Sequence, residues 1–123
     1  MSQARFPLSP DDLPEATAFA PFSVELSPQP GRLAVAVHGE LDLATAPFFE
    51  AMLNAAINAS DRPDVVEIDL GGLDFVDVAG SRALHSVAVR QMSRSHALRL
   101  RGPSRQARRL FAITGLDAIA ELC

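Results

Sequence analysis

The stretch that decides the fold is residues 67–84, which read EIDLGGLDFVDVAGSRAL. Its first residues complete a buried apolar strand that we place at residues 65–70, and an amphipathic helix is expected to begin near Ala79. The short acidic loop between them ends at Asp77, so this corner brings helical N–H groups and a carboxylate to one exposed point. Corners of this kind often carry a recognition site or a phosphorylation switch.

Two strands are predicted before the first helix. Apolar and polar residues alternate from Phe22 to Leu26, and from Leu33 to Val37 large apolar residues on one face alternate with alanines on the other. A turn rich in proline at residues 28–31 joins these segments, so we expect an antiparallel pair. The chain is expected to leave the second strand at Gly39.

Three helices are predicted from apolar residues at helical spacing. The first has its cap at Thr45 or Ala46, and the second covers residues 79–93. The third begins after the N-cap Ser104 and ends at Gly115, which suits a left-handed backbone.

A strand at residues 98–100 and a strand or turn at residues 118–122 complete the pattern. Because strands alternate with helices after the opening pair, the fold class is α/β. We expect one domain over residues 22–123, with helices packed on a mixed, mainly parallel sheet of four to five strands. The proline-rich residues 1–21 are expected to form a flexible N-terminal arm.

Composition limits the class of protein. The chain has 123 residues and a formal net charge of −4, which argues against direct binding of nucleic acid. It has no apolar run long enough to span a bilayer and no basic leader followed by an apolar segment, so we expect no membrane insertion. A single cysteine, Cys123, is consistent with a reducing cytoplasm.

The carboxylates near the corner have two interpretations. Asp69, Asp74 and Asp77 could converge on Mg²⁺ in a phosphotransfer enzyme. The chain has no lysine and no glycine-rich phosphate cradle, which disfavours that reading. We favour helix capping, by Asp77 at the second helix and by Asp42 near the first. We therefore expect no enzymatic activity, no metal and no cofactor.

The histidines show no metal-ligand spacing. His38, His85 and His96 are scattered along the chain, and a zinc site is not expected. His85 shares the outer face of the second helix with Arg82 and Val89. That face is either a binding surface or a solvated one, and the sequence does not decide between them.

The arginines near the C-terminus and Ser81 also have two readings each. The arginine group consists of Arg99, Arg101, Arg105, Arg108 and Arg109. A solvated face is the favoured interpretation, and a surface for an acidic partner is the second. Ser81 has no adjacent histidine and no nucleophile elbow, so it is either an ordinary first-turn serine or a phosphorylation site.

Three stretches, in order along the chain, resemble a known family. Residues 39–46 read GELDLATA, and residues 69–77 read DLGGLDFVD, followed by Gly80. The third stretch, residues 98–116, contains LRL, PS, RLF and TGL. Together they are similar to the STAS domain of bacterial anti-sigma factor antagonists, also called anti-anti-sigma factors. The resemblance covers residues 22–123 and implies a STAS-like fold.

The resemblance implies a protein that regulates transcription by binding another protein. Antagonists of this family dock on an anti-sigma factor, usually a serine kinase of the GHKL type, and so free a sigma factor. The kinase can phosphorylate the serine that follows the signature aspartate, and the added charge breaks the complex. Here that position is Val78, followed by Ala79, so the usual phosphoacceptor is absent. Ser81 is the candidate substitute.

The resemblance and the corner together give an expected partner-binding set. It consists of Asp42, Asp77, Val78, Ala79, Gly80, Ser81, Arg82, His85 and Val89. An alternative is a STAS scaffold or regulatory subunit of a stressosome-like or lipid-transport ATPase assembly. In either case we expect a monomer or a weak dimer.

Overall fold

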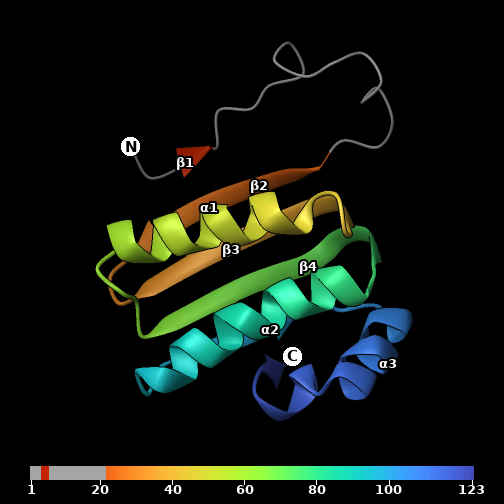
Figure 1. The fold of residues 1–123 in the computed structure, drawn as a ribbon. Coiled ribbons are helices and arrows are strands. Elements are labelled where there is room, and N and C mark those ends of the chain that lie inside the picture. The colour runs from red at the N-terminus through yellow and green to blue at the C-terminus, as the bar shows by residue number, and fades with distance from the viewer. Residues whose placement is uncertain (1–3, 6–21) are drawn as a thin grey trace.

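The structure of the chain is a computed structural model that describes residues 4–5 and 22–123 (Figure 1). Its strands form one sheet whose order in space follows the sequence. They are β1 (Ala4–Arg5), β2 (Ser23–Gln29), β3 (Arg32–Leu41), β4 (Val65–Val76), β5 (Ala97–Arg101) and β6 (Glu121–Leu122). The pairs from β1 to β3 are antiparallel and those from β3 to β6 are parallel. The predicted α/β class and the mixed, mainly parallel sheet are thus confirmed.

The helices are α1 (Ala46–Ala59), α2 (Val78–Ser93) and α3 (Arg105–Thr114), followed by the short 3-10 helix η3 (Leu116–Ala118). In Figure 1, α1 lies across β2 and β3, and α2 lies along β4, on the same face of the sheet. The third helix packs against α2 near one end of the sheet. The fold therefore has two layers, with helices on one face.

The core lies between the sheet and the helices, as the alternation of apolar residues predicts. Leu33, Val37, Val66, Ile68, Leu84, Val87, Leu100 and Phe111 are all fully buried. Two predicted end signals are also confirmed. Ser104 caps α3 by accepting a hydrogen bond from the Ala107 N–H, and Gly115 ends it with φ 82°. Leu116 then returns to the core.

Two strands run further than predicted. β3 continues past Gly39 to Leu41, and β4 continues past Leu70 to Val76, where an acidic loop was expected. The register between them shifts twice, between Ala36 and His38 and between Gly39 and Glu40. These irregularities break the simple alternation that marks a strand in the sequence, which is why the extensions were missed. Beyond Asp69, the last residue paired with β5, β4 pairs only with β3.

The sheet has six strands rather than the four to five predicted. The additional strand is β1, a two-residue edge, whereas β6 falls within residues 118–122, where a strand or turn was predicted. β1 lies within the expected N-terminal arm, and Ala4 and Arg5 pair with Leu26 and Glu25 of β2. The rest of that arm, residues 1–3 and 6–21, lies outside the described residues.

Candidate docking site

Asp77 joins the end of β3 to the start of α2. As predicted, it is the N-cap of α2, and its Oδ1 accepts a hydrogen bond from the Gly80 N–H at 2.9 Å. Its Oδ2 accepts a second bond from the Leu43 N–H at 3.2 Å, and its own N–H donates to the Leu41 carbonyl at 3.2 Å. One carboxylate therefore fixes the positions of two chain segments that are far apart in the sequence.

Asp42 organises the loop that Asp77 holds, which we call the Asp42 loop (residues 42–45). Its Oδ1 accepts hydrogen bonds from the N–H groups of Ala44 at 2.9 Å and Thr45 at 3.1 Å. The Thr45 hydroxyl accepts from the Asp42 N–H and donates to the Glu40 carbonyl. The predicted capping of α1 by Asp42 is wrong: the N-cap is Thr45, without a side-chain cap bond, and the Asp42 carboxylate instead closes the loop that precedes the helix.

Gly80 allows α2 to begin directly against β3. A Cβ atom at this position would lie 2.3 Å from the Leu41 carbonyl oxygen and 2.9 Å from Cγ2 of Val76. Both distances are shorter than real Cβ contacts, so any side chain would push the helix away from the strand. Gly80 is buried and acts as a structural residue of the corner, not as a contact residue as expected.

Ser81 also faces the interior. Its side chain is 0% exposed, and its Oγ lies 2.7 Å from Oγ1 of Thr114 on α3. Its expected roles as a partner contact and a candidate phosphoacceptor both need an accessible hydroxyl, which the folded chain does not provide. Ala79 is half-buried and packs against the core, so it too contributes to the frame of the corner.

The exposed residues of α2 follow one face of the helix. Val78, Arg82, His85 and Val89 are separated by four, three and four residues, which places them in one stripe. Val78 is 46% exposed and Val89 is 48% exposed, while Arg82 is exposed and His85 is half-buried. This arrangement confirms the predicted outer face and shows that it is partly apolar.

Two further residues, which were not in the expected partner-binding set, extend this stripe. Met92 follows Val89 by three residues and is 53% exposed. Leu43, in the Asp42 loop, is 74% exposed, and its N–H is bonded to Asp77 next to Val78. We call the resulting surface the docking face; it consists of Leu43, Val78, Arg82, His85, Val89 and Met92. The spacing of Met92 was visible in the sequence, whereas the place of Leu43 depends on tertiary contacts.

The alternative carboxylate site is not assembled. Within residues 4–5 and 22–123, no group of three or more histidine, cysteine, aspartate or glutamate side chains is placed to hold a metal ion. Asp69 bonds the N–H of Gly71 and Asp77 bonds those of the corner. Asp69, Asp74 and Asp77 therefore do not converge on one site. A separate finding is that none of the described helices is long and apolar enough to cross a membrane.

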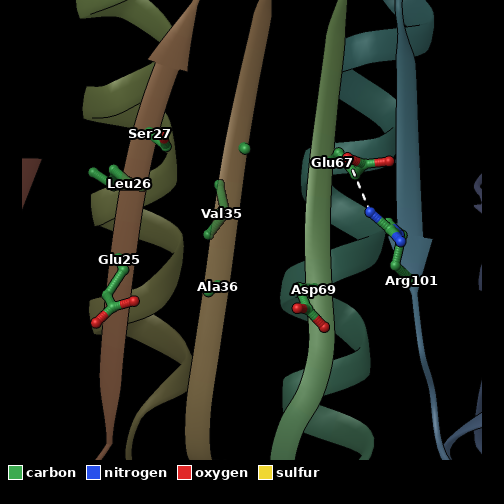
Figure 2. A pocket seen from close by; sticks show the side chains of 9 residues that line it. Glu25, Leu26, Ser27, Val35, Ala36, Glu67, Asp69 and Arg101 are labelled. Atoms are coloured by element: carbon green, nitrogen blue, oxygen red, sulfur yellow. Dashed lines mark ion pairs between the residues drawn. The ribbon is translucent and has the colours of Figure 1, made fainter. Parts of the chain in front are cut away.

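A second candidate site lies on the face of the sheet that carries no helices (Figure 2). It is a hollow of about 360 Å³ above the small side chains of Ala34 and Ala36. The Glu67 carboxylate at its rim pairs with Arg101 at 3.8 Å and also with Arg32. The hollow shares no residue with the docking face.

Comparisons with known proteins agree with this architecture. The family model described as "Mlab, STAS domain" matches residues 24–122. A search of curated proteins found no match. Among solved structures, an anti-sigma factor antagonist from Mycobacterium paratuberculosis is 25% identical, with a TM-score of 0.69 and coverage of 83% of this chain and 85% of that one.

Two further structures share the fold at lower identity. The unphosphorylated form of the anti-sigma factor antagonist SpoIIAA is 17% identical, with a TM-score of 0.65 and coverage of 84% of this chain and 87% of that one. A variant of RsbS from Moorella thermoacetica is 19% identical, with a TM-score of 0.67 and 86% coverage of both chains. Since the family model spans almost all of the described domain, the chain belongs to the STAS domain family, and its fold is that of the anti-sigma factor antagonists.

Proposed function

We propose that this protein is an anti-sigma factor antagonist that binds an anti-sigma factor through the docking face and so frees a sigma factor. The observation that carries the proposal is the apolar part of that face. Leu43, Val78, Val89 and Met92 are four of the six large apolar side chains exposed among the described residues. Apolar side chains gathered on a fixed frame are typical of a protein-binding surface.

The chemistry of the corner supports a partner that cannot switch this protein off by phosphorylation there. Val78 holds the position after the signature aspartate and has no hydroxyl, and the Ser81 hydroxyl is buried against Thr114. We propose that a GHKL-type serine kinase is the anti-sigma factor, and that the complex persists in the presence of ATP. Such a partner implies a cytoplasmic, non-enzymatic binding protein.

The docking face is tested by placing a charge within it. Val78→Asp leaves the core unchanged because Val78 is 46% exposed, and it puts a carboxylate into the apolar contact. We expect the native protein to retain the anti-sigma factor in co-purification from its own cells and Val78→Asp to lose it. The control is Ala55→Asp on the exposed side of α1, which should retain it. Equal retention by both variants contradicts the proposed face, and recovery of transport ATPase subunits instead would favour the alternative assembly.

The missing phosphoacceptor is tested by restoring it. Val78→Ser places a hydroxyl at the exposed first residue of α2. With the purified kinase partner and ATP, we expect phosphate on this variant and release of the complex, because a dianion would then enter the interface. The native protein and Val78→Ala should remain unmodified and bound. Phosphate on the native chain, located by mass spectrometry, would refute constitutive docking.

A further inference from the structure

The exposed side of α3 is strongly basic. Arg105, Arg108 and Arg109 are exposed and follow the i, i+3, i+4 spacing that places side chains on one side of a helix. The helix contains no aspartate or glutamate in its ten residues, although the chain as a whole has a net charge of −4. The helix thus carries three positive charges and no negative one within an acidic protein. We call these three residues the arginine face.

The arginine face has no partner within the protein. Four ion pairs exist among the described residues, and their cations are Arg32, His96, Arg99 and Arg101. None of the three guanidinium groups of the arginine face belongs to these pairs or to a side-chain hydrogen bond in the described part of the chain. These side chains contribute no intramolecular contact that would account for their presence.

The position of the arginine face is locally unfavourable for α3. Arg105 and Arg108 lie at the first turn, where the helix macrodipole is positive and acidic residues stabilise a helix. The first turn has no acidic residue. Residues that break a local stability rule without a compensating contact are expected at functional sites. The charge is therefore more consistent with a binding role than with a solvated face.

We propose that the arginine face binds an acidic segment of a protein partner. Guanidinium groups pair with carboxylates in bidentate geometry, and three of them on one helix match a short run of aspartate or glutamate. Ile113, at the other end of α3, is 81% exposed and supplies an apolar contact beside them. This mixture of charged and apolar side chains favours a protein segment over nucleic acid.

This surface goes beyond the proposed function, because it lies on α3 and shares no residue with the docking face. The contact between Ser81 and Thr114 holds the two helices together, so one partner could span both surfaces. The test must therefore be independent of any anti-sigma factor. A fluorescent glutamate-rich peptide is the probe, titrated with the whole protein and followed by fluorescence anisotropy.

We expect the peptide to bind at low salt, and more weakly as salt rises. The variant R105E/R108E should bind about tenfold more weakly, because each reversal removes an attraction and adds a repulsion. Its matched control is R62E/R94E, which has the same net charge and changes two exposed arginines outside α3. Circular dichroism confirms that both variants are folded.

Three results would overturn the proposal. The first is no binding of the peptide by the native protein at low salt. The second is an equal loss of affinity in the control variant, since net charge alone would then explain binding. The third is tighter binding of a single-stranded oligothymidylate of the same charge, which would identify a nucleic-acid surface instead. None of these results depends on whether Val78 contacts an anti-sigma factor.

Discussion

Replacing Gly80 with alanine tests whether the close approach of α2 to β3 builds the corner. Glycine has no side chain here, and a Cβ atom would lie 2.3 Å from the Leu41 carbonyl oxygen. That oxygen belongs to the backbone of a paired strand and accepts the Asp77 N–H. The carbonyl has no freedom to rotate away as the end of a flexible side chain would. The helix or the strand end must move instead.

The expected loss of stability follows from three opposing effects. Forcing a methyl group into a packed contact costs up to about 3 kcal/mol. Weakening the bond from Asp77 to the Leu41 carbonyl costs about 1 kcal/mol more. Alanine is the better helix former inside α2, which returns about 1 kcal/mol. We therefore expect Gly80→Ala to lower the free energy of unfolding by about 3 kcal/mol and the melting temperature by roughly 10 °C.

Urea denaturation followed by circular dichroism measures this loss. The midpoint should fall while the slope of the transition stays the same, because the surface exposed on unfolding hardly changes. Gly71→Ala is the matched control: its Cβ would meet only the exposed Asp69 carboxylate, at 3.1 Å, so its effect should stay within about 0.5 kcal/mol. If Gly80→Ala is as stable as the native protein, or more stable, the steric explanation of the corner is refuted.

Three other positions yield predictions of the same kind. Asp77→Ala loses both carboxylate hydrogen bonds and should lower the free energy of unfolding by about 1–2 kcal/mol. Asp77→Asn keeps an acceptor and should cost less. If urea denaturation gives the same loss of stability for both variants, the capping role is contradicted. Ser81→Ala removes the hydrogen bond between the Ser81 and Thr114 hydroxyls and leaves Thr114 only its longer bond to the Phe111 carbonyl. It should lower stability by about 1 kcal/mol, and thermal unfolding will detect or disprove this loss. The buried Gln91 donates from Nε2 to the carbonyls of Pro63 and Ala97. Gln91→Ala should therefore lower the free energy of unfolding by about 3 kcal/mol. A loss below about 1 kcal/mol would show that these hydrogen bonds are dispensable.

Most of the fold could be predicted because each element buries one regular face. Alternation marks β2 and the first half of β3, and helical spacing marks α1, α2 and α3. Prediction failed where a strand continues to pair with its neighbour although its apolar and polar residues no longer alternate. The second half of β4 reads GGLDFV and has only β3 beside it, so its residues do not show a buried and an exposed face in turn.

The site was predicted by position but not by orientation. Asp77 was identified correctly as the cap of α2, and the helix begins at Val78, one residue before the predicted start at Ala79. Ser81 was assigned to the outside, although it precedes Leu84 by three residues and Ala88 by seven, and so shares their buried stripe. That signal was present in the sequence. The exposure of Leu43 could not be predicted from the sequence, because the hydrogen bond to Asp77 that holds its loop joins residues 34 positions apart.

The first turn of α2 contains both buried and exposed residues. Gly80 and Ser81 are buried, whereas Val78 and Arg82 are exposed, so a charge added by a kinase in this turn must be added at position 78. Valine cannot accept it. The Thr45 hydroxyl of the neighbouring loop is also engaged, since it donates to the Glu40 carbonyl. Control of binding by phosphate at this corner would thus need the loop to open or the helix turn to unfold, which would destroy the surface it regulates. If the two proposed surfaces bind as we infer, their occupancy follows partner abundance, and binding at α3 weakens as ionic strength rises.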